Sequence, residues 1–124
     1  MELRAIGATI DANDPERLAD FWQRAIGFKS RVGDGNPYIT LSDSGVGRPL
    51  NHLTVQRVPE SKTAKHRLHL DLFVSDDEAA IAELEALGAT VIVPSSGPGH
   101  QGMTATVMAD PEGGEFCVVC RRKS

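Results

Sequence analysis

Residues 67–90 read RLHLDLFVSDDEAAIAELEALGAT. Over residues 67–74 apolar side chains alternate with other types, which predicts a β-strand with two different faces. The apolar face consists of Leu68, Leu70, Leu72 and Val74. The opposite face carries His69, Asp71 and Phe73. A histidine and an aspartate on one strand face lie either in bulk water or against a polar cavity that binds a ligand.

The rest of the stretch predicts a helix. Ser75 or Asp76 can cap its N-terminus, because a short polar side chain there accepts a backbone N–H that the first turn leaves free. Gly88 supplies a helix end. The apolar residues between them recur at helical spacing and form one stripe, which can cover the leucine face of the strand: Ile81, Leu84 and Leu87.

The same plan occurs earlier, in residues 5–28, AIGATIDANDPERLADFWQRAIGF. An offset of 62 residues places Gly7 on His69 and Asp14 on Asp76. Here too a strand, with Ile6, Ala8 and Ile10 on one face, precedes a helix that Asp14 caps and Gly27 ends. Three further strands follow in each half, at residues 28–32, 38–43 and 50–58 and at residues 90–94, 103–110 and 115–121.

Two βαβββ modules, about residues 1–60 and 66–122, therefore predict an α+β fold. We expect one domain over residues 1–124, in which eight strands form a cup-like mixed sheet with the helices on the outside. The faces away from the helices would then line a cavity of the kind that binds small molecules. From the alternation alone, these faces carry Thr9, Asp11, Tyr38, His69, Asp71 and Phe73.

Composition excludes several classes of function. The chain has 124 residues, 40% of them hydrophobic, and a formal charge of −4. An acidic balance disfavours nucleic-acid binding, which needs a basic face. No apolar run approaches the ~20 residues of a membrane span, and the first residues do not resemble a signal peptide. We expect a cytoplasmic protein without a nucleic-acid or membrane partner.

Two other segments allow competing interpretations. Cys117 and Cys120 have the spacing of a redox or zinc pair, but residues three apart on a strand lie on opposite faces, which favours separate thiols. Residues 59–67, PESKTAKHR, are either a solvated surface loop or a basic lip over an anionic ligand. The glycine-rich segments 42–49 and 95–102 lack the ending of a phosphate loop and are interpreted as turns or a flap.

The doubled plan resembles the vicinal oxygen chelate superfamily, and more narrowly the glyoxalase/bleomycin-resistance/dioxygenase group. The resemblance covers essentially the whole chain. It depends on the order of three segments: DPERLADFW at 14–22, RLHLDLFV at 67–74 and ADPEGGEFCVV at 109–119.

The resemblance implies a divalent metal held by four side chains, one from the first and one from the last strand of each module. By position these fall on Gly7, on His69, on Cys117 and on one of His52, Thr54 and Gln56. Glycine offers no ligand, and cysteine replaces the usual carboxylate. The usual ligand set is therefore incomplete in at least two places, while His69 keeps a family ligand and the fourth position stays open.

Three functions stay open. The first is a metal-free protein that binds a small organic molecule, for resistance or for an uncharacterised reaction. The second is a metal-dependent lyase, isomerase or dioxygenase, with His69 as a ligand and Asp71 as the nearest base. The third is a structural domain in which these two side chains only satisfy each other. The resemblance also implies a homodimer. The residues expected to contact a ligand are Thr9, Tyr38, Gln56, His69, Asp71, Phe73 and Cys117.

Overall fold

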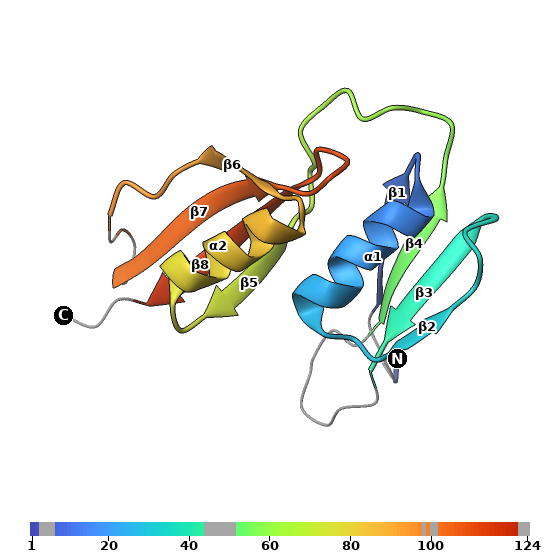
Figure 1. Cartoon of the computed structure of the whole chain (residues 1–124), viewed down its shortest axis with the longest axis horizontal. Helices are drawn as coiled ribbons and strands as arrows, with labels where there is room; N and C mark the ends of the chain where they lie inside the picture. The colour runs from blue at the N-terminus through green and yellow to red at the C-terminus, as the bar shows by residue number, and fades with distance from the viewer. Residues whose placement is uncertain (3–6, 44–51, 98, 100–101, 122–124) are drawn as a thin grey trace. The chain divides into compact units, whose positions relative to one another are not determined.

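The computed structural model describes residues 1–2, 7–43, 52–97, 99 and 102–121. Within these, the chain forms two compact units, Met1–Ser61 and Lys62–Ser124 (Figure 1). Ile6 and most of the glycine-rich segment 42–49 lie outside the described residues, as do positions 98, 100 and 101 of segment 95–102.

Unit 1 contains one helix and one four-stranded sheet. Its elements are β1 (Gly7–Ala12), α1 (Pro15–Ile26), β2 (Ser30–Val32), β3 (Tyr38–Ser42) and β4 (His52–Arg57). The strands lie in the order β1-β4-β3-β2. β1 runs parallel to β4, and the other two pairs are antiparallel.

Unit 2 repeats this topology. Its elements are β5 (Leu70–Val74), α2 (Asp77–Leu87), β6 (Thr90–Val93), β7 (Met103–Ala109) and β8 (Glu115–Arg121). The order β5-β8-β7-β6 and the parallel pair β5/β8 correspond strand by strand to unit 1. The prediction of two βαβββ modules with mixed sheets and an α+β fold is confirmed. A cup that joins the eight strands stays a prediction.

Both helices begin and end where the sequence predicts. The Asp14 carboxylate accepts the Arg17 N–H at 3.3 Å, and Pro15 occupies the first turn, where no backbone donor is needed. In unit 2 the cap is Asp76, which accepts the Ala79 N–H at 3.1 Å. Gly27 and Gly88 both adopt positive φ, the left-handed conformation that ends a helix.

The core of unit 1 lies between α1 and its sheet (Figure 1). Trp22 is 1% exposed and meets the neighbouring Phe21 ring edge to face, with the centroids 5.1 Å apart. Alternate residues of the two central strands complete this core because a strand presents every second side chain to the same layer. They are Ile39, Leu41, Leu53 and Val55.

Unit 2 has a sparser interface between helix and sheet. Leu84 is buried as expected, but Ile81 and Leu87 are only half-buried. Leu68, expected beneath α2, is 78% exposed, and that prediction is wrong. The reason is that β5 begins only at Leu70, where its pairing with β8 starts, so the chain before it does not follow the strand alternation.

Candidate functional site

The face of each sheet that points away from its helix differs between the units. In unit 1 the register places Thr9 beside Thr54 and Tyr38 beside Gln56. Thr54 is also within 3.3 Å of the Thr40 hydroxyl, so one of the two donates to the other. All of these side chains are half-buried or exposed, and the face is mainly polar, with Val32 and Tyr38 as its exposed apolar residues.

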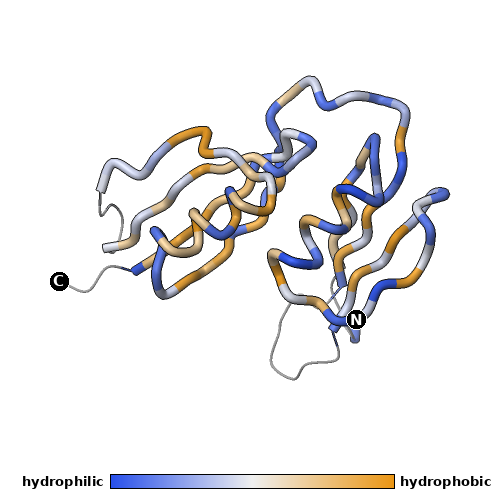
Figure 2. The backbone as a smooth tube through the Cα atoms, in the orientation of Figure 1, coloured by the Kyte–Doolittle hydropathy of each residue, from blue (hydrophilic) through white to orange (hydrophobic). Residues whose placement is uncertain are grey.

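The corresponding face of unit 2 is mostly apolar. Phe73 is 72% exposed and lies beside Val119, and Val107 lies beside Cys117. The tube of β8 is orange over most of its length (Figure 2), because Phe116–Cys120 are all apolar on both faces of the strand. An open apolar surface next to a few polar groups is typical of ligand-binding walls.

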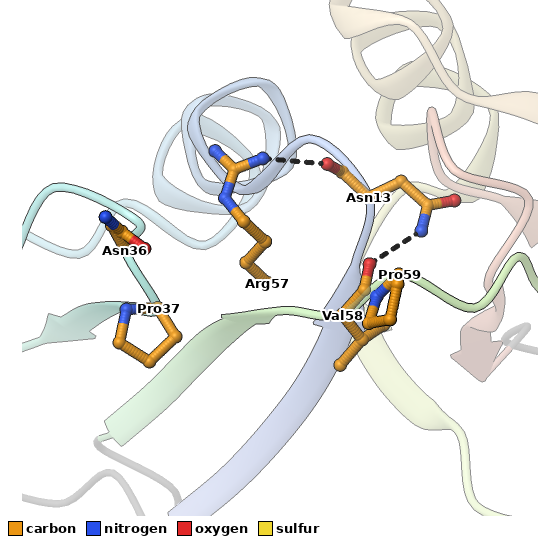
Figure 3. Close-up of a pocket in the computed structure, with 6 residues that line it drawn as sticks. All are labelled: Asn13, Asn36, Pro37, Arg57, Val58 and Pro59. Atoms are coloured by element: carbon orange, nitrogen blue, oxygen red, sulfur yellow. Dashed lines mark hydrogen bonds between the residues drawn. The ribbon is translucent and has the colours of Figure 1, made fainter.

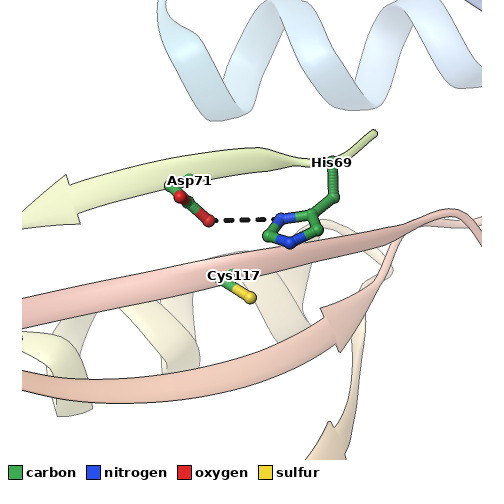
Figure 4. A group of neighbouring side chains, drawn as sticks. All are labelled: His69, Asp71 and Cys117. Carbon is green, nitrogen blue, oxygen red and sulfur yellow. Dashed lines mark ion pairs between the residues drawn. The ribbon is translucent and has the colours of Figure 1, made fainter. Parts of the chain in front are cut away.

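The polar groups of this face cluster at the start of β5 (Figure 4). His69 Nδ1 lies 3.2 Å from Asp71 Oδ1, and one donor atom each of His69, Asp71 and Cys117 lie within 4.8 Å of one another. Asp71 is placed opposite Cys117 by the parallel pairing of β5 with β8. The imidazole and the carboxylate are accessible, and the thiol is half-buried between them and the sheet.

The thiol of Cys117 is held in its protonated form. Burial raises its pKa above the ordinary value, and the negative charge of Asp71 raises it further, while the positive charge of Lys65 acts in the opposite direction. Because the thiolate is the nucleophilic form, Cys117 is not an activated nucleophile in this environment. A bound metal ion would have the opposite effect on Cys117, since coordination favours the thiolate over the protonated thiol.

A second charged group lies beside the cluster. Glu115, on the same face of β8 as Cys117, accepts a hydrogen bond from Lys62 Nζ at 2.7 Å and one from the His66 N–H at 3.0 Å. The hydrogen bond from Lys62 and then that from His66 lower the pKa of Glu115 to about 2. Lys62 and His66 are thus tied to the sheet of their own unit, and this end of the linker is not a freely solvated loop.

The register identifies the position that the sequence left open. Asp71 lies opposite Cys117, and the residue that corresponds to Asp71 in unit 1, Thr9, lies opposite Thr54. Of the three alternatives, Thr54 is therefore the counterpart of Cys117. The residues of unit 1 that match His69, Asp71 and Cys117 are Gly7, Thr9 and Thr54. Glycine has no side chain, and a threonine hydroxyl is not a common metal ligand, so unit 1 offers no common metal ligand at these matching positions.

The expected ligand contacts fall into two groups. Thr9, Tyr38 and Gln56 lie on the open face of unit 1, and His69, Asp71, Phe73 and Cys117 belong to unit 2. The structure brings His69, Asp71 and Cys117 together. Cys120 lies on the other face of β8, and both cysteines are free thiols, so the CVVC segment is not a joint site.

Unit 1 also contains a groove that was not predicted from the sequence. The groove forms around Arg57, at the end of β4 (Figure 3). The sequence offers one signal for it. β4 ends at Arg57, whereas the matching position of the second module holds the buried Cys120.

Several solved structures share this fold. A glyoxalase/bleomycin resistance protein/dioxygenase family enzyme from Burkholderia phytofirmans is 18% identical, with 94% of this chain and 97% of that chain covered and a TM-score of 0.70. A glyoxalase-related enzyme from Fulvimarina pelagi is 18% identical over 95% and 88%, with a TM-score of 0.68. A glyoxalase/bleomycin resistance protein/dioxygenase from Nocardioides is 12% identical over 100% and 87%, with a TM-score of 0.71.

At these identities the likeness establishes the fold alone. No curated protein matches the chain. None of the helices in the part of the chain that the structure describes is long and apolar enough to cross a membrane. The family of glyoxalase-like domains matches residues 7–119, nearly the whole sequence. Together with the doubled βαβββ topology, this match shows that the chain belongs to the glyoxalase-like domain family, as the resemblance predicted.

Proposed function

We propose that this glyoxalase-like protein binds a small organic molecule on the open faces of its sheets, without the complete four-ligand metal centre of its superfamily. The observation that carries the proposal is the cluster of His69, Asp71 and Cys117 at the edge of the apolar face of unit 2. The bound molecule could be sequestered, as in resistance, or it could undergo an uncharacterised reaction. The cluster supports both of these roles equally.

The geometry defines what such a ligand needs. His69 Nδ1 lies 3.2 Å from Asp71 Oδ1, and an imidazole with its proton on Nδ1 leaves Nε2 as a hydrogen-bond acceptor. The Asp71 carboxylate keeps further acceptor capacity because it is exposed and has two oxygens. Phe73 provides a flat apolar surface on the same face. We therefore expect a molecule with an apolar, preferably aromatic, body and at least one N–H or O–H donor.

Ligand-observed NMR with a fragment library of aromatic amides and alcohols tests this proposal. Hits whose saturation-transfer signal is lost in both His69→Ala and Asp71→Asn support it. Glu83→Gln, a change on the exposed surface of α2, is the control and should leave binding intact. A library without hits, or hits that bind both variants as well as the wild type, would overturn it.

A second candidate function is a metal-dependent lyase, isomerase or dioxygenase with His69 as a ligand. The three donors of unit 2 within 4.8 Å favour it, because imidazole, carboxylate and thiolate are all zinc ligands. Bound there, the ion would supply Lewis-acid polarisation of a substrate oxygen. The ligands would be His69, Cys117 and Asp71, with no ligand from Gly7 or Thr54.

Metal analysis of the purified protein decides between the two functions. Stoichiometric zinc that is lost in both His69→Ala and Cys117→Ser supports the second. His52→Ala is the informative comparison, because His52 is the histidine of unit 1 beside Gly7 and lies outside the cluster. Loss of metal in that variant alone would contradict a site built from unit 2.

We also propose that the protein is a cytoplasmic homodimer. The support is the family resemblance, together with two free cysteines, which suit a reducing compartment. The exposed apolar residues of unit 2 are suited to burial against another surface. Light scattering at micromolar concentration tests the dimer, and a monomer mass would contradict it.

A further inference from the structure

The groove around Arg57 lies within unit 1 and involves none of the residues proposed above (Figure 3). Its volume of about 490 Å³ is within the range of small-molecule sites. It forms where β4 ends and where the chain leaves β1 for α1. The residues that line it are Asn13, Asn36, Pro37, Arg57, Val58 and Pro59.

The guanidinium of Arg57 is held in place by two backbone carbonyls. Nε donates to the Gly35 carbonyl at 2.9 Å, and Nη1 donates to the Asn13 carbonyl at 3.3 Å. An arginine side chain has five N–H donors, so three remain for a ligand. A planar fork that is already oriented loses little conformational entropy when it binds a second planar group.

Arg57 has no acidic partner among the described residues, where every carboxylate lies beyond 4 Å from its guanidinium. Two acidic side chains close in sequence to the groove residues accept backbone hydrogen bonds. Asp34 accepts the Asn36 N–H at 3.0 Å, and Asp14 accepts the Arg17 N–H at 3.3 Å. The groove thus contains a fixed positive charge whose counter-ion is not one of these described carboxylates.

The second module shows what the fold alone requires at this position. Cys120 pairs with Val74 as Arg57 pairs with Ala12, and its thiol donates to the Ser75 carbonyl at 3.5 Å. Like Asn13, Ser75 directly precedes the helix cap. One short donor is therefore enough to tie the end of this strand to the start of the helix. Arg57 therefore has more N–H donors than are needed to tie the end of the strand to the start of the helix.

We propose that Arg57 forms a subsite for the carboxylate group of a small organic acid. A carboxylate matches the guanidinium fork with two parallel hydrogen bonds. Pro37, Val58 and Pro59 provide apolar walls for the remainder of the molecule, and Asn36 adds an exposed amide at the rim. The apolar walls favour an organic acid over an inorganic anion, which has no apolar part to bury.

Titration of the ¹⁵N-labelled protein with benzoate tests the proposal. We expect saturable shifts of the Val58 amide and of the Asn36 side chain. Benzamide, which has the same shape without the charge, should bind at least about tenfold more weakly, because a hydrogen bond to a charged group is the stronger one. Arg57→Gln should abolish the shifts, and Arg57→Lys should keep a weakened response because a point charge cannot form the fork.

Arg31→Gln is the matched control, since Arg31 is an arginine of unit 1 that pairs with Asp20 on the surface. It should bind benzoate as the wild type does. The absence of saturable shifts in the wild type, equal binding of benzoate and benzamide, or retained binding in Arg57→Gln would each overturn the proposal. If Arg57→Gln does not fold, the comparison of benzoate with benzamide on the wild-type protein still decides.

Discussion

The two units share a backbone plan and differ in where they place apolar side chains. α1 buries five residues against its sheet, with Phe21 and Trp22 among them, whereas α2 buries Leu84 and the polar Asp77. On the opposite face the order reverses. Unit 1 presents Thr9, Thr54 and Gln56 there, and unit 2 presents Phe73 and several valines.

This difference shows that the topology and the use of each face are determined separately. The helix caps, the strand order and the parallel pairing recur in both units, although the outward faces differ. The outward faces are not needed for these features. They can therefore differ, with a His–Asp–Cys cluster in one unit and two threonines and a glycine at the matching positions of the other.

Substitutions in the cores of the two units should change the free energy of unfolding most. Trp22→Ala should lower the free energy of unfolding by about 3–5 kcal/mol, because it removes the largest fully buried side chain. Leu84→Ala in α2 should cost about 2 kcal/mol, since its surroundings are less tightly packed. Urea denaturation followed by circular dichroism measures both. An equal or greater loss at Leu84 would contradict the stronger packing of unit 1.

Removal of a threonine hydroxyl should have a smaller effect on stability, and this effect should differ between the two units. Thr104, buried in unit 2, has its hydroxyl 3.0 Å from the Asp77 carboxylate and 3.2 Å from the Cys120 carbonyl. Thr104→Val should cost about 2 kcal/mol, because a buried carboxylate loses a donor. Thr54→Val removes a hydroxyl from the half-buried contact with Thr40 and should cost about 0.5–1 kcal/mol. Thermal denaturation that ranks the two variants in the reverse order would contradict this assignment.

A smaller effect depends on pH. The pKa of Glu115 is lowered from 4.5 to about 2 in the folded protein, so its contribution is present above pH 4.5 and is lost as the pH falls towards 2. Glu115→Gln should therefore be less stable than the wild type at pH 7, by on the order of 1 kcal/mol, and equally stable near pH 2. Urea titrations at several pH values measure the difference.

Glu83→Gln, on the exposed surface of α2, serves as the control for this series and should show no such pH-dependent difference. A constant difference between Glu115→Gln and the wild type from pH 7 to pH 2 would contradict the assignment of the lowered pKa to the hydrogen bonds from Lys62 and His66.

The smallest expected change in stability tests the open faces directly. Phe73 and Asp11 occupy matching positions, 62 residues apart. Phe73→Asp should change stability by less than about 0.5 kcal/mol, because the ring is largely exposed. It should reduce the fluorescence of the dye anilinonaphthalene sulfonate, and Asp11→Phe should increase it. Unchanged dye fluorescence in both variants would contradict the difference between the faces.

Local signals in the sequence predicted most of the fold. The capping aspartates, the glycines at the helix ends and the alternation of strand residues each act over a few positions, so they can be identified without the tertiary structure. The prediction was wrong at Leu68 for the same reason. Alternation continues through that residue, but the pairing with β8, which decides where β5 begins, involves residues far away in the sequence.

Local patterns in the chain were enough to predict the two βαβββ modules, their helix caps, the family resemblance and the pair of His69 and Asp71. Three further facts required the folded structure: Thr54 corresponds to Cys117, Lys62 is bound to Glu115, and Arg57 lies in a groove. These three facts depend on strand register and on the path of loops. Both are set by contacts between residues distant in the chain, which no local pattern encodes.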